Sequence, residues 1–194
     1  MDEQFLKKHQ KRIKRLKARV KSSRVTVHNM RPYEDFLYSL GKFWKFGEKI
    51  TILEIGVGYG QSTNAFLKGL KDRVEPIDGI ENDGILYSID IKKKHQRSVK
   101  DEELKKRWVF IHGDSKEVGW DKPIDILFID GSHTYENCRA DYKKYEPFVL
   151  EKGLILLHDV LYPQMGVYKA WNEIKYPKFI LSMNRPGLGL VTKE

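Results

Sequence analysis

The chain has 194 residues, 40% of them apolar and 32% charged, a composition that fits one globular domain and excludes a disordered or fibrous protein. Its formal charge of +9 comes almost entirely from the first 25 residues, so it does not characterise the rest of the chain. No apolar stretch approaches the roughly 20 residues of a membrane span, no secretory signal begins the chain, and the single cysteine, Cys138, excludes an intrachain disulfide, so we expect a cytoplasmic protein.

Residues 1–25 are predicted to form a basic, amphipathic helical arm, separate from a domain that spans residues 26–194. The arm holds ten of the 36 Lys and Arg side chains and two of the 27 Asp and Glu, which leaves 26 basic and 25 acidic side chains in a nearly neutral domain. Spacings of 3, 4, 3 and 4 residues align one helical stripe: Leu6, His9, Ile13, Leu16 and Val20. We expect this stripe to dock on the domain or on a sister subunit in a homo-oligomer, with an anionic surface such as RNA as the alternative partner.

Downstream of the arm, short apolar runs alternate with amphipathic stretches. In chain order the pattern predicts a helix over residues 33–46, a strand over 49–56, a helix over 61–71, strands over 84–91, 108–115 and 124–131, a helix over 135–150, a strand over 153–160 and a helix over 167–175. The charged segment 92–106 is expected as a loop or an exposed helix, and residues 179–183 and 188–192 as a hairpin. This order indicates a Rossmann-like, doubly wound α/β fold with a mostly parallel seven-stranded sheet, an antiparallel C-terminal hairpin and N-terminal helices.

The first predicted strand ends in the glycine-rich run Glu54-Ile-Gly56-Val-Gly58-Tyr-Gly60. In an open parallel sheet, ligands bind beyond the carboxyl ends of the strands, where glycines let the backbone approach them closely. Dinucleotide-binding turns have the spacing GxGxxG, and here Gln61 occupies the position of the third glycine. The Glu54 carboxylate would repel a phosphate and attract a cation, so the turn favours the sulfonium of S-adenosylmethionine over NAD.

The next two predicted strands also end in polar residues. Asp90 ends the second strand, where an acidic side chain can accept hydrogen bonds from ribose hydroxyls. Asp114 and Ser115 end the third strand, where they could meet the edge of an adenine. Each residue alone could be a strand-end cap, but three acidic strand ends in succession favour a ligand that contains a nucleoside.

The motifs LEIGVGYGQST, YSIDI, HGDS, DILFIDGSHTYE and GLILLHDV together resemble class I S-adenosylmethionine-dependent methyltransferases. More narrowly they resemble the small-molecule O-methyltransferase branch, including macrolide-sugar O-methyltransferases, cephalosporin-hydroxylase-like proteins and, more distantly, catechol O-methyltransferase. The resemblance covers about residues 50–160. It implies S-adenosylmethionine as cofactor and a hydroxyl on a sugar or another small metabolite as methyl acceptor.

The same resemblance implies which residues contact the cofactor along the strand ends. The methionine part would contact Glu54, Gly56, Gly58 and Gly60, and its carboxylate would contact Ser62. The ribose would bind Asp90, and the adenine would contact Asp114 and Ser115. Asp130 would lie at the same site.

The resemblance further implies a divalent metal, Mg²⁺ or Mn²⁺, bound by Asp130, His158 and Asp159. Relatives often carry an Asn or Asp after the strand-five acid, whereas here His158 precedes Asp159 and Val160 follows it. Histidine is a better ligand for Mn²⁺, Fe²⁺ or Zn²⁺ than for Mg²⁺, so the residues leave the metal open. The metal would lower the pKa of the acceptor hydroxyl, and His133 is the predicted general base, with a structural loop histidine as the alternative.

Two other functions are compatible with the sequence. An RNA ribose 2′-O-methyltransferase would use the basic arm, although Asp130-Gly-Ser-His133 differs from the Asn/Asp-Pro-Pro-aromatic motif of enzymes that methylate amino groups of nucleic acids. A non-catalytic, oligomeric scaffold would bind S-adenosylmethionine without an acceptor pocket. We favour O-methylation of a small molecule, with nucleic acid as the less favoured partner.

Overall fold

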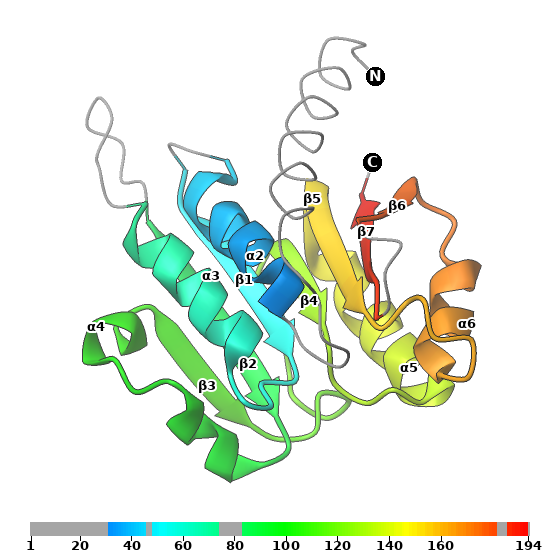
Figure 1. The fold of residues 1–194 in the computed structure, drawn as a ribbon, viewed down its shortest axis with the longest axis horizontal. Coiled ribbons are helices and arrows are strands. Elements are labelled where there is room, and N and C mark those ends of the chain that lie inside the picture. The colour runs from blue at the N-terminus through cyan, green and yellow to red at the C-terminus, as the bar shows by residue number, and fades with distance from the viewer. Residues whose placement is uncertain (1–30, 46–47, 74–82, 182–185, 194) are drawn as a thin grey trace, which may run out of the picture.

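The computed structural model describes residues 31–45, 48–73, 83–181 and 186–193, so the predicted arm lies outside the described residues. These residues build one seven-stranded sheet with helices on both faces (Figure 1). The strands are β1 (Ile50–Ile55), β2 (Gly84–Asp90), β3 (Trp108–His112), β4 (Ile124–Ile129), β5 (Val149–His158), β6 (Lys178–Ile180) and β7 (Leu188–Thr192). In the order β3-β2-β1-β4-β5-β7-β6, the first five strands of the sheet are parallel, and β7 is antiparallel to both of its neighbours. The predicted fold class is confirmed.

Two layers of helices cover the sheet. α2 (Arg31–Phe43) and α3 (Gln61–Lys71) lie on one face, and α5 (Tyr135–Tyr145) and α6 (Gly166–Glu173) lie on the other (Figure 1). Successive strand residues point to opposite faces, so Ile52 packs with α2 and α3 while Leu53 packs with α5 and α6. Because both faces are covered, the central strands are apolar at nearly every position. None of the helices in the described part of the chain is both long and apolar enough to cross a membrane.

α2 is fixed against α3 by glycine contacts and a buried arginine. A Cβ on Gly69 would lie 2.2 Å from the carbonyl oxygen of Tyr38, so the two helices approach closely there. The Arg73 guanidinium donates to four carbonyl oxygens at and beyond the end of α2, over distances of 2.7–3.1 Å. These hydrogen bonds satisfy carbonyls at the end of the helix, and the arrangement holds α2 over the sheet with Tyr33 near the end of β5.

Several element boundaries differ from the prediction. α2 begins at Arg31 and ends at Phe43 instead of spanning 33–46. α5 ends at Tyr145 instead of residue 150, because Pro147 lacks the N–H that would continue the helix, and a short 3₁₀ helix, η2 (Glu146–Phe148), follows. β5 begins at Val149 instead of residue 153, with an irregular pairing to β4 before Leu154. β6 spans Lys178–Ile180, one residue earlier than the predicted start at Phe179, and residues 182 and 183 of the prediction lie outside the described residues.

The charged segment 92–106 forms two short helices, η1 (Lys93–Ser98) and α4 (Glu102–Lys105), with mostly exposed side chains. η1 also packs on the glycine turn after β1, where the Ser98 hydroxyl donates to the carbonyl oxygen of Gly58 at 3.1 Å. Of the two predicted states of this segment, the exposed helix is the one observed, and it forms one wall of the site described next.

Candidate active site

Three glycines with positive φ angles shape the turn after β1. Gly56, Gly58 and Gly60 have φ angles of 91°, 54° and 78°, a region that other residues rarely adopt. Gly56 is also restricted by contact, since a Cβ there would lie 2.3 Å from the carbonyl oxygen of Asp130. The glycines therefore bring the turn against the end of β4 and direct backbone N–H groups toward Asp90.

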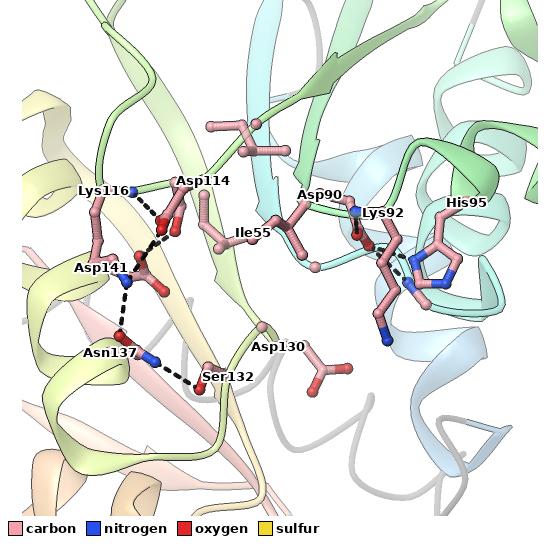
Figure 2. Close-up of a pocket in the computed structure, with 17 residues that line it drawn as sticks. Ile55, Asp90, Lys92, His95, Asp114, Lys116, Asp130, Ser132, Asn137 and Asp141 are labelled. Carbon is pink, nitrogen blue, oxygen red and sulfur yellow. Dashed lines mark hydrogen bonds and ion pairs between the residues drawn. The ribbon is translucent and has the colours of Figure 1, made fainter.

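A cavity of about 390 Å³ opens at the carboxyl ends of β1 to β4, within the size range of small-molecule sites. Figure 2 shows Asp90 and His95 on one side of it, Asp114 and Asp141 on the opposite side, and Asp130 between them. The cavity lies where the strand-end rule for parallel sheets expects a ligand.

Six of the nine residues predicted to contact a cofactor line this cavity: Gly56, Gly58, Asp90, Asp114, Ser115 and Asp130. The other three, Glu54, Gly60 and Ser62, are not among its lining residues. Gly60 instead caps the start of α3 in a left-handed conformation.

Glu54 is fully buried in a polar network beneath the turn. Its carboxylate accepts hydrogen bonds from the hydroxyls of Ser62 at 2.6 Å, Thr63 at 2.8 Å and Ser88 at 2.6 Å. Burial raises the pKa of Glu54 to about 7, although the three hydroxyl donors favour the charged form. The polar atoms of Glu54 and Ser62, which sequence reasoning assigned to the cofactor, thus bind each other and join β1 to the start of α3.

The Asp90 carboxylate is surrounded by hydrogen-bond donors at one side of the cavity. Its Oδ2 accepts from the backbone N–H groups of Val57 at 2.9 Å and Gly58 at 3.3 Å, and lies 2.7 Å from Nδ1 of His95. Its Oδ1 accepts from the backbone N–H of Lys92 at 2.7 Å. Burial opposes the negative charge, but these hydrogen bonds outweigh burial and lower the pKa of Asp90. An ionised carboxylate therefore stands where the sequence predicts the ribose.

The opposite side of the cavity is formed by the loop after β3 and by α5. Asp114 accepts from the backbone N–H of Lys116 at 2.9 Å, and the Lys116 ammonium lies 3.2 Å from its other oxygen. Ser115 donates its hydroxyl to the buried carboxyl of Asp141 at 2.6 Å. Burial raises the pKa of Asp141, so this side of the cavity presents a carboxyl of reduced acidity beside Asp114.

Sequence reasoning missed Asp141 and His95. Asp141 lies on one helical stripe with Cys138 and Tyr145, both of them buried. One carboxylate on an otherwise apolar buried stripe is a usable signal for a functional residue. His95 offers no such signal, because it is one polar residue in a charged segment and only the fold of η1 brings it to Asp90.

Two carboxylates and two imidazoles meet at the ends of β4 and β5. Nε2 of His133 lies 3.2 Å from Oδ2 of Asp159 and 3.7 Å from Oδ1 of Asp130. Nδ1 of His158 lies 3.0 Å from Oδ1 of Asp130 and 3.6 Å from Oδ1 of Asp159. Among the described residues, Asp130, His133 and Asp159 form a group whose ligand atoms all lie within 4.8 Å of one another. His133, the predicted general base, thus lies beside Asp130 and Asp159, the two carboxylates predicted to bind metal.

The strand pairing explains why Asp130 meets His158. Ile129 pairs with Leu157 in the parallel β4–β5 ladder, so the residues that follow them are neighbours on one face of the sheet. This is the face covered by α2, where the His158 ring meets Tyr33 edge-on with the ring centroids 5.9 Å apart. Asp159 follows with a φ angle of 62°, a conformation unusual for a residue with a side chain and common at functional sites.

The two histidines differ in exposure and share their charge partners. The His133 side chain is 45% exposed, whereas that of His158 is 8% exposed. The neighbouring carboxylates, first Asp130 and then Asp159, raise the pKa of His133. Burial disfavours the charged form of His158, but the Asp130 carboxylate outweighs burial and raises its pKa. Burial also opposes the charge on Asp130, and the two imidazoles together lower the pKa of that carboxyl. The geometry and charge of this group suit a divalent cation.

Residues 53–160 match the protein family described as "Methyltransferase domain". A protein of Sinorhizobium fredii (strain NBRC 101917 / NGR234) named "Uncharacterized protein y4gI" is 30% identical over 76 residues, which make up 37% of this chain and 8% of that protein. The chain thus spans less than a tenth of the length of this relative.

Solved methyltransferase structures share the fold. The SAH-bound methyltransferase PaMTH1 of Podospora anserina has a TM-score of 0.64 and 15% identity, covering 86% of this chain and 80% of that one. The O-methyltransferase of Bacillus cereus in complex with SAH has a TM-score of 0.62 and 17% identity, covering 95% and 90%. CalS11, a TDP-rhamnose 3′-O-methyltransferase of calicheamicin biosynthesis, has a TM-score of 0.61 and 17% identity, covering 93% and 92%. Because the family match spans more than half of the chain and reaches from β1 to the end of β5, the chain belongs to the methyltransferase domain family.

Proposed function

We propose that this protein is an S-adenosylmethionine-dependent O-methyltransferase that acts, with the help of a divalent metal, on a hydroxyl of a sugar or another small metabolite. The observation that carries the proposal is the position of Asp130, which lines the cavity and also belongs to the group with His133 and Asp159. A cofactor in the cavity and an acceptor at that group would therefore meet at one carboxylate.

The cavity supplies the contacts that the cofactor needs. The ionised Asp90 suits the ribose hydroxyls, and the glycine turn lets the backbone approach the methionine part without a Cβ in the way. The chemistry that S-adenosylmethionine supplies is a methyl group on a sulfonium. Glu54, Ser62 and Thr63 act on the cofactor through the backbone, because their network joins β1 to the start of α3.

Asp130, Asp159 and His158 are the residues that would hold the metal. Their side chains are largely buried, and their oxygen and nitrogen atoms are the ligand types of divalent metals. A metal bound there would supply Lewis-acid chemistry, lowering the pKa of an acceptor hydroxyl.

Exposure distinguishes the roles of the two histidines. The His133 side chain is 45% exposed at the mouth of the group, so its ring can reach a substrate, whereas that of His158 is 8% exposed. His133 is the proposed general base. In the reaction the acceptor oxygen gains the methyl group, its proton moves to the neutral imidazole of His133, and the sulfonium becomes a thioether.

The acceptor class is supported by the related folds. The Bacillus cereus protein is an O-methyltransferase and CalS11 methylates a sugar hydroxyl, and both cover at least nine tenths of this chain. We therefore propose a hydroxylated small molecule, with sugars tested first.

The test measures formation of S-adenosylhomocysteine from S-adenosylmethionine with a panel of hydroxylated sugars and phenols, in the presence of Mg²⁺ or Mn²⁺. Asp130→Ala is expected to abolish turnover while the melting temperature stays close to that of the wild type. Asp121→Ala, which removes an exposed acid outside the cavity, is the matched control and should leave turnover unchanged. Wild-type turnover in Asp130→Ala, or a product methylated on nitrogen, would overturn the proposal.

A further inference from the structure

The group at the ends of β4 and β5 contains two nitrogen donors as well as two carboxylates. His133 presents Nε2 to both carboxylates from the mouth of the site, at 3.2 and 3.7 Å. His158 presents Nδ1 to both from the buried side, at 3.0 and 3.6 Å. Each imidazole therefore reaches both Asp130 and Asp159.

These separations match those of atoms that share one metal ion. Oxygen and nitrogen ligands lie about 2.0–2.2 Å from a transition-metal ion, so neighbouring ligands of one ion are about 3.0–3.6 Å apart. The two separations of Nδ1 of His158 from the carboxylates, 3.0 and 3.6 Å, fall within this range.

His158 is the decisive residue because it is the buried nitrogen donor of the group. Its side chain is more than nine-tenths buried, with Nδ1 directed at the two carboxylates. Within the described residues, its Nε2 is buried and has no hydrogen-bond partner. Burying an incompletely bonded imidazole costs free energy, so its presence is best explained by what Nδ1 binds. Tyr33 packs edge-on against the ring and limits its rotation.

We infer that this centre, which rests on the proposed metal-assisted function, selects a first-row transition-metal dication of the class Mn²⁺ to Zn²⁺ over Mg²⁺. Mg²⁺ prefers oxygen ligands in near-ideal octahedral geometry and gives up its water reluctantly. Imidazole nitrogen suits transition metals, whose affinities for mixed nitrogen and oxygen sites rise along the first row. The Nδ1 of His158 is the donor that sets this selectivity, and Asp130 and Asp159 supply the charge.

The experiment measures binding of Co²⁺, Mn²⁺ and Mg²⁺ to the full chain by calorimetry, together with the visible absorption of bound Co²⁺. Wild-type protein is expected to bind Co²⁺ at least about tenfold more tightly than Mg²⁺. His158→Asp, which replaces the nitrogen donor with a carboxylate, should reduce the ratio of the two affinities by about tenfold or more, the usual effect of altering a metal site. His112→Asp makes the same change at an exposed histidine outside the centre and should leave the ratio unchanged.

A second measurement does not depend on whether His158→Asp folds. Electron spin-echo modulation of Mn²⁺ bound to the wild type should show the ¹⁴N coupling of a directly bound imidazole, and its absence would overturn the inference. Equal affinities of the wild type for Mg²⁺ and Co²⁺, with turnover intact, would overturn the selectivity alone. Failure of all three metals to bind would overturn both the metal-assisted function and the proposed selectivity.

Discussion

Nδ1 of His158 lies 3.0 Å from Oδ1 of Asp130, and this contact joins the last residue of β5 to the first residue after β4. The β4–β5 register produces it, since Ile129 pairs with Leu157 directly before the two residues. Asp130 also lines the cavity beside the glycine turn. One carboxylate thus connects the region proposed for the cofactor with the region proposed for the acceptor.

The role of His133 as general base predicts a loss of turnover without a loss of metal. His133→Ala should lower kcat by about 10²–10⁴-fold, the usual contribution of a positioned base. Metal affinity should change little, because Asp130, His158 and Asp159 remain. Single-turnover kinetics and Mn²⁺ titration of the same variant test both statements, with the exposed His112→Ala as control. A variant that loses Mn²⁺ binding in parallel with kcat would show that His133 is a metal ligand instead.

The buried Glu54 predicts a specific pH dependence of stability. Its pKa is about 7 in the folded protein, above its ordinary value of 4.5, because burial disfavours the charge. A carboxyl with a raised folded-state pKa stabilises the fold through its bound proton, so this contribution is full below about pH 4.5 and is lost as the pH rises through about 7. Glu54→Gln stays uncharged and should lack this loss, which is on the order of 3 kcal/mol.

Urea unfolding of the wild type and Glu54→Gln between pH 4 and 8 tests this dependence. The difference in unfolding free energy between the two proteins should change across the window from about pH 4.5 to 7. Glu117→Gln removes an exposed carboxyl and serves as the control. A difference between wild type and Glu54→Gln that is constant with pH would contradict the account.

The close approach of α2 and α3 predicts that Gly69→Ala destabilises the fold. Alanine normally stabilises a helix relative to glycine by about 1 kcal/mol. Here its Cβ would lie 2.2 Å from the carbonyl oxygen of Tyr38, and overpacking of this kind costs about 1–3 kcal/mol. We expect the clash to exceed the propensity gain and lower the melting temperature. Gly119→Ala, with nothing within 4 Å of its Cβ, should not lower it, and an equal effect of both substitutions would contradict the packing argument.

The strands and the glycine turn could be predicted from the sequence because their signals are local. An apolar run such as residues 124–131 indicates a buried strand whichever elements pack against it. The three glycines likewise indicate a turn without reference to tertiary contacts. Residues that follow such strands can be assigned to one edge of the sheet by the strand-end rule alone. Asp90 and Asp114 are predicted in this way and Asp130 by the family resemblance, and all three line the cavity.

The contacts that could not be predicted depend on register and on tertiary position. The contact of His158 with Asp130 follows from the β4–β5 register, which the sequence of either strand does not specify. The direction of the Glu54 side chain depends on hydroxyls from α3 and β2, so only the assembled fold shows that it is buried away from the cavity. The end of α5 could have been predicted, because Pro147 is present in the sequence and marks the change from α5 to η2.

The central claim is that the cavity binds S-adenosylmethionine, and its most direct test is a thermal-shift titration with S-adenosylhomocysteine. At about 100 times its dissociation constant, a ligand of the folded state adds about 2.7 kcal/mol, which for a domain of this size raises the melting temperature by roughly 5–10 °C. We predict such a shift for the wild type, a smaller one for Asp90→Ala, and none with NAD or ATP. No shift with S-adenosylhomocysteine, or an equal shift with NAD, would contradict the account.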